Sequence, residues 1–108
     1  MSRDIRNQLS EGLAEAVETG DSSKLAQTVD NFRQQPLADY YRDYLENRYA
    51  CYQKALAVIG GGITDPIQQA LVLWNLGLFF EVHEVLEHVW YTAEGKMRVT
   101  LQALIRAA

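Results

Sequence analysis

Apolar side chains recur at helical spacing along almost the whole chain, and this periodicity constrains the fold more than any other feature. Ile5, Leu9, Leu13 and Val17 repeat every four residues and would form one apolar stripe on a helix. No segment has comparable support as a strand. The pattern therefore predicts an all-α fold, a helical bundle of about six helices arranged as antiparallel pairs.

Breaks in the periodicity mark the ends of the helices. The clearest break is "GGGITDP", residues 60–66, where glycines can end one helix and Asp65 and Pro66 are typical of the start of the next. It divides the chain into an N-terminal helical region, residues 1–60, with three helices, and a motif region, residues 64–108. The helices expected are 5–19, 23–35, 38–58, 66–75, 79–90 and one from about residue 96.

Composition excludes several classes of protein. The 108 residues carry a net charge of −4, and no basic block is present that would follow nucleic-acid phosphates. No apolar run reaches the length of a membrane span, and the polar N-terminus does not resemble a signal peptide. We expect a cytoplasmic protein that binds neither nucleic acid nor membrane, with any small-molecule ligand unknown.

The segment "FFEVHEVLEHVW", residues 79–90, combines ionisable and apolar side chains on one expected helix. On a helical wheel the main apolar stripe consists of Phe79, Val82, Leu86 and Val89. His83 and Glu87 lie one turn apart beside this stripe, bracketed by Phe80 and Trp90. The solvent-facing side is expected to carry Glu81, Glu84 and His88.

The enclosed His83–Glu87 pair is the candidate site, because an enclosed carboxylate is unfavourable unless it is paired or ligated. The two side chains could ligate one divalent metal ion, form a structural ion pair, or let Glu87 orient His83 as a general base. A metal needs a third ligand from elsewhere. Gln102 on the last helix could face the pair, and Arg98 or Arg106 could neutralise Glu87. The spacing differs from His-Glu-x-x-His, which excludes a zinc peptidase.

Arg48 lies near the middle of the apolar side of the third helix. Its alkyl stem could cover the rim of the core while the guanidinium stays in water. Alternatively, Arg48 neutralises a buried carboxylate elsewhere in the fold, and we include it among the candidate pocket residues.

The motif region resembles a family of bacterial and archaeal proteins, the domain of unknown function 309 family. Its signature, N-x-G-x-(Tyr/Phe)-Phe-Glu-x-His-Glu-x-Leu-Glu-x-x-Trp, reads "NLGLFFEVHEVLEHVW" here. The matching residues are Asn75, Gly77, Phe79, Phe80, Glu81, His83, Glu84, Leu86, Glu87 and Trp90. A second family segment, Leu-Gln-Gly-Leu-Ile-Gln, reads "LQALIR" and departs from the family at Ala103 and Arg106.

The resemblance extends from about Ile67 to the end of the chain. It implies an all-helical fold with the motif in a helix-lined pocket, and it implies metal binding without an established activity. The candidates it transfers are His83, Glu87 and Trp90, followed by Glu84 and Gln102. The family usually continues beyond the final helix, so we also expect this chain to be cut short at its C-terminus.

Two functions remain open from the sequence. The first is a small helical protein with a polar His/Glu/Trp pocket, metal-binding and hydrolase-like, in which His83 and Glu87 are the catalytic and metal-binding candidates. The second is a non-enzymatic helical interaction module that forms a homo-oligomer. The many aromatic side chains favour the second, which requires an apolar helix face left exposed in the monomer.

Overall fold

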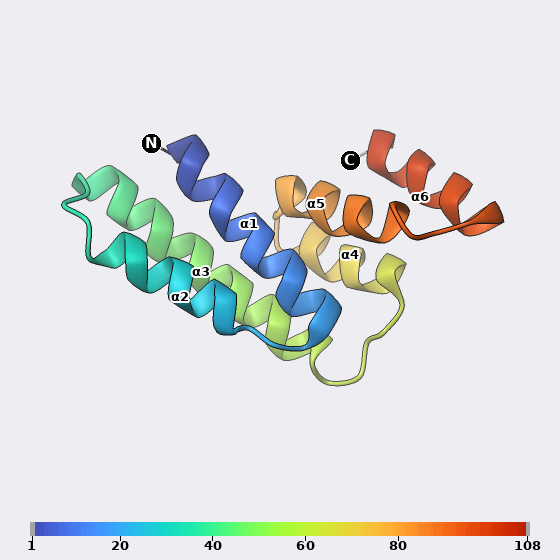
Figure 1. The fold of residues 1–108 in the computed structure, drawn as a ribbon, viewed down its shortest axis with the longest axis horizontal. Coiled ribbons are helices and arrows are strands. Elements are labelled where there is room, and N and C mark those ends of the chain that lie inside the picture. The colour runs from blue at the N-terminus through green and yellow to red at the C-terminus, as the bar shows by residue number, and fades with distance from the viewer. Residues whose placement is uncertain (1, 108) are drawn as a thin grey trace.

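The computed structural model describes residues 2–107, with side chains from residue 3, and confirms the all-α prediction. Its helices are α1 (Ser2–Thr19), α2 (Ser23–Arg33), α3 (Asp39–Ile59), α4 (Pro66–Asn75), α5 (Phe79–Trp90) and α6 (Gly95–Ala107). Consecutive helices run in alternating directions (Figure 1). The observed boundaries differ from the expected ones by only a few residues, because the caps and breaks were visible in the sequence.

Two local signals explain how α4 begins and ends. The Oδ1 atom of Asp65 accepts a hydrogen bond of 2.9 Å from the backbone N–H of Ile67, and Pro66 occupies the first position of α4. Gly77 has a φ of 75°, a left-handed conformation that other residues rarely adopt. The chain can therefore reverse between α4 and α5 within three residues, which brings the motif helix back along α4.

Helix α5 holds the two parts of the chain together. It packs against α1 on one side, and α4 and α6 also pack on it. In Figure 1 helices α1, α2 and α3 lie side by side, α4 and α5 lie next to them, and α6 is at the far end. One continuous core contains Leu9 and Leu45 from the N-terminal region and Leu78 and Leu86 from the motif region.

The last helix is less enclosed than the others. α6 packs mainly against α5, and Leu101 is its one buried side chain among the described residues. Met97 and Val99 on the same helix are exposed. None of the described helices combines the length and the hydropathy that crossing a bilayer requires.

Candidate functional site

Glu81, at the start of α5, is fully buried, although the sequence placed it on the solvent-facing side of the helix. That expectation was wrong. A helical wheel finds the most apolar stripe of a helix, but α5 is central and is covered on more than one side. The side that carries Glu81 faces α3, which supplies the two polar partners of its carboxylate.

Arg48 and Tyr52 of α3 bind the Glu81 carboxylate. Arg48 donates from Nε to Oε2 at 3.0 Å and from Nη2 to Oε1 at 2.9 Å, a bidentate pair. The Tyr52 hydroxyl donates to Oε2 at 2.5 Å. Of the two interpretations of Arg48, the structure therefore shows the pairing with a buried carboxylate. Burial and the adjacent Glu81 carboxylate raise the pKa of Tyr52, so its hydroxyl keeps the proton that it donates.

His83 and Glu87 are both half-buried on α5, but the structure does not bring them together as a pair. Among residues 2–107, the hydrogen bonds and ion pairs include no contact between them. No cluster of three or more His, Cys, Asp or Glu side chains in this part of the chain could hold a metal ion. No His, Cys, Asp or Glu side chain among the described residues therefore completes a three-ligand site with His83 and Glu87.

Arg98, Gln102 and Arg106, the polar residues of α6 that the sequence placed near Glu87, lie around Trp90 instead. The guanidinium carbon of Arg98 lies 4.0 Å from the centroid of the Trp90 ring, a cation–π contact. Trp90, Arg98, Gln102 and Arg106 line one open cavity of about 420 Å³. The expected neutralisation of Glu87 by these arginines is not present among the described ion pairs.

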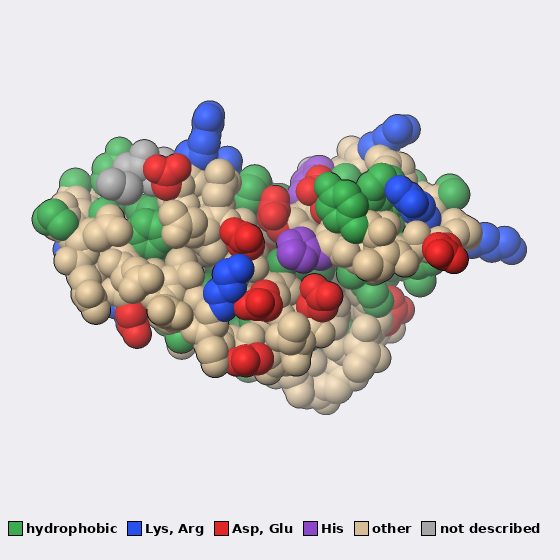
Figure 2. Space-filling model, in the orientation of Figure 1, with side chains coloured by type: hydrophobic (Ala, Val, Ile, Leu, Met, Phe, Trp, Pro, Cys, Tyr) green, Lys and Arg blue, Asp and Glu red, His purple; other side chains and the backbone are tan. Residues whose placement is uncertain are grey.

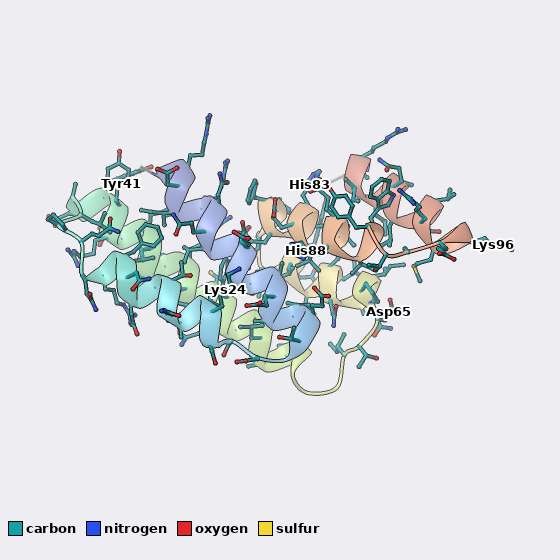
Figure 3. All side chains as sticks on the ribbon, in the orientation of Figure 1. Lys24, Tyr41, Asp65, His83, His88 and Lys96 are labelled. Atoms are coloured by element: carbon teal, nitrogen blue, oxygen red, sulfur yellow. The ribbon has the colours of Figure 1, made fainter. Side chains whose placement is uncertain are left out.

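Glu84 and His88 differ in environment, although the sequence placed both in solvent. His88 is exposed, and its Nδ1 atom lies 3.6 Å from the Oε2 atom of Glu18 on α1. Glu84 is half-buried, and with Glu11 and His88 it lines a cavity of about 330 Å³ between α1 and α5. Burial, followed by repulsion from Glu87, raises the pKa of Glu84. Carboxylates surround His88 on this face (Figures 2 and 3).

Phe79 is exposed and does not belong to the buried stripe that the sequence predicted. Its ring packs edge to face against Trp74, which is also exposed, with ring centroids 5.0 Å apart. Glu81 and Val82 in the same turn are buried, so Phe79 lies on the uncovered side of α5. The two aromatic rings therefore form part of the molecular surface near the α4–α5 turn.

Comparison with known proteins supports the resemblance drawn from the motif. Residues 67–108 match the model of a family described as Domain of unknown function (DUF309), which confirms the resemblance over this segment. No curated protein and no solved structure matches the chain. The family description assigns no activity, so the chemistry rests on the residues themselves.

Replacing Arg48 by Met should lower the free energy of unfolding by about 3 kcal/mol, because the buried Glu81 carboxylate would lose its counter-charge. The matched control is Arg33→Met. Arg33 binds Glu46 with the same bidentate geometry, at 2.8 and 2.7 Å, but both side chains are more than two-fifths exposed. The control should lose about 1 kcal/mol or less. Urea unfolding of both variants tests the difference.

The double variant Arg48→Met/Glu81→Leu should recover much of the stability lost in Arg48→Met, because it removes the unpaired charge as well as its partner. Equal losses in Arg48→Met and Arg33→Met would contradict the assignment of Arg48–Glu81 as a buried pair that the fold requires.

Glu84→Gln should stabilise the protein at neutral pH. The pKa of Glu84 is raised above its ordinary 4.5 in the folded state, so the folded state binds the proton more tightly than the unfolded chain. Stability is therefore lost as pH rises from 4.5 through the raised pKa of the folded state, and the glutamine removes that loss. The gain should disappear well below pH 4.5, where both states are protonated. Thermal unfolding across pH measures it, and a gain independent of pH would contradict the assignment.

Proposed function

We propose that this chain is a helical interaction module that associates with a second copy of itself through the surface formed by α4, α5 and α6. The observation that carries the proposal is an apolar groove of about 240 Å³ between these helices. Its lining residues are Ile67, Ala70, Leu71, Trp74, Val82, Leu86, Leu104 and Ala107. None of them has a charged side chain, so an apolar partner could fill the groove without burying an unpaired charge.

The absence of charge extends beyond the groove. Residues 66–80 contain no Asp, Glu, Lys, Arg or His, in a chain where 22% of residues are charged. Leu71, Trp74 and Phe79 within this segment are exposed. Depletion of charge together with exposed aromatic side chains is typical of the centre of a protein–protein interface, and tryptophan is prominent among residues that dominate binding energy.

Several features favour a second copy as the partner. In a twofold-symmetric dimer the same patch meets itself, so it must offer both a recess and a projecting group. The groove supplies the recess, and Leu71 and Trp74 on its edge supply apolar groups that are about half exposed. Two copies each carrying a net charge of −4 repel one another, which favours contact through the uncharged segment.

Interface size sets how far the contact must extend. A stable interface buries about 800 Å² on each partner, which is a substantial part of the 6532 Å² surface of this chain. The groove alone is too small, so the contact must continue onto α6. Met97 is exposed there, seven residues before the groove residue Leu104 and therefore on the same face of α6.

Leu71→Lys should shift the protein from dimer to monomer in sedimentation velocity, measured over a range of protein concentrations. The change places a charge in the centre of the proposed contact. Val58→Lys is the matched control, because Val58 on α3 is 53% exposed and Leu71 is 55% exposed, but Val58 lies outside the groove. The control should remain dimeric. A parent protein that is monomeric at every concentration would contradict the proposal.

A second candidate function is metal binding at His83 and Glu87, and one observation favours it. Both side chains are half-buried. No hydrogen bond or ion pair within residues 2–107 uses the imidazole nitrogens of His83 or the carboxylate oxygens of Glu87, which are the atoms that could ligate a metal. The fit is partial, because two residues fill only two coordination positions. A hydrolase-like role would rest on the metal polarising a water molecule.

Elemental analysis of untagged protein tests this second candidate. If His83 and Glu87 bind a metal, the parent should contain a divalent metal that is lost in His83→Ala and retained in His88→Ala. His88 is the control because it lies on the same helix but is exposed and close to Glu18. No metal in the parent, or equal metal content in both variants, would contradict metal binding at His83.

A further inference from the structure

We infer that a cleft between α1, α3 and α4 binds a small organic amine that carries an apolar chain. The cleft consists of two adjoining cavities, of about 480 Å³ and about 160 Å³. They share four lining residues, Val17, Glu18, Thr64 and Gln69. The larger cavity alone has the size of an ordinary ligand pocket, about 300 to 1,000 Å³.

The arrangement of the helices explains the cleft. α1 ends at Thr19 and α3 ends at Ile59, and the glycine-rich loop after α3 leads around both ends into α4 (Figure 1). The loop glycines carry no side chains that could fill the space. Leu56 and Ile59 from α3 and Val17 from α1 supply apolar walls. An alkyl or aryl group could therefore bury its surface there.

The polar side chains of the cleft accept hydrogen bonds more readily than they donate them. Gln69 is 8% exposed, and its Nε2 atom donates to the carbonyl of Ile63 at 3.0 Å. This bond fixes the amide and leaves Oε1 as an acceptor, to which no described residue donates. Oε1 is not among the fully enclosed side-chain atoms that lack a partner, so it remains accessible and can accept a hydrogen bond from a ligand in the cleft.

The charge of the cleft indicates a cation. Among residues 2–107, Glu18 is the one charged side chain that lines the larger cavity. No Lys or Arg of this part of the chain lines the larger or the smaller cavity. Asp65 lies between Thr64 and Pro66, which line the smaller cavity, and caps α4. An ammonium group has donors for both Glu18 and Gln69 Oε1, whereas a carboxylate or phosphate would be repelled.

The smaller cavity also includes His88 of α5. Its Nδ1 atom lies 3.6 Å from Glu18 Oε2, so the imidazole and a bound amine would approach the same carboxylate.

The experiment is calorimetric titration of the untagged protein with n-hexylammonium, hexan-1-ol and hexanoate. These three probes share one apolar chain and differ in the polar group. We expect n-hexylammonium to bind, the alcohol to bind more weakly and hexanoate not to bind. Glu18→Gln should weaken binding of the amine about tenfold, the loss of one charge-assisted hydrogen bond. The amide signal of Gln69 in NMR spectra should shift on binding and locate the probe.

Glu15→Gln is the matched control, because it removes the same charge from the same helix at a residue that lines neither cavity. Its affinity for n-hexylammonium should equal that of the parent. Equal binding of the amine and the alcohol, equal weakening in both variants, or no binding of n-hexylammonium would each overturn the proposal. Glu18 is exposed, so Glu18→Gln should leave the fold intact, which circular dichroism can check.

Discussion

The bidentate pair between Arg48 and the fully buried Glu81 is the interaction on which the arrangement of the two regions depends. Apolar packing between α1 and α5 would tolerate small rotations, because hydrophobic contact is not directional. A buried carboxylate with three directional hydrogen bonds does not tolerate such rotations. Any rotation that breaks these bonds leaves the buried charge less well paired. The pair therefore fixes how α5 faces α3, and through α5 it positions both α4 and α6.

The same constraint explains why the candidate residues of α5 lie in different environments. Once Glu81 faces α3, the helical spacing places Glu84 toward α1 and leaves His83 and Glu87 half-buried. Phe79 then projects near Trp74 at the surface. Among the charged residues of the motif, Glu81 thus positions the helix. In the uncharged segment 66–80, Leu71, Trp74 and Phe79 remain exposed.

Sequence alone was sufficient for the helices, because the apolar periodicity is local and the clearest boundaries have local causes such as the Asp65 cap or the left-handed Gly77. It was not sufficient for the face of α5 that carries Glu81. A helical wheel treats a helix as having one buried side, and the number of neighbours around α5 is a property of the tertiary fold. The one available signal was Arg48, a lone cation on an apolar face, for which a buried anion was one of two interpretations. Its partner lies 33 residues away, beyond the reach of local periodicity.

Helix α4 links the two surfaces that we propose. It is ten residues long, and it presents Leu71 and Trp74 to the apolar groove and Gln69 to the cleft beside α1. A ligand that binds only the folded arrangement stabilises it, whichever face it occupies. A partner on the groove and an amine in the cleft would both hold α4 in place against α3 and α5. Because coupling between binding sites is reciprocal, any effect of one on the affinity of the other must appear in both directions.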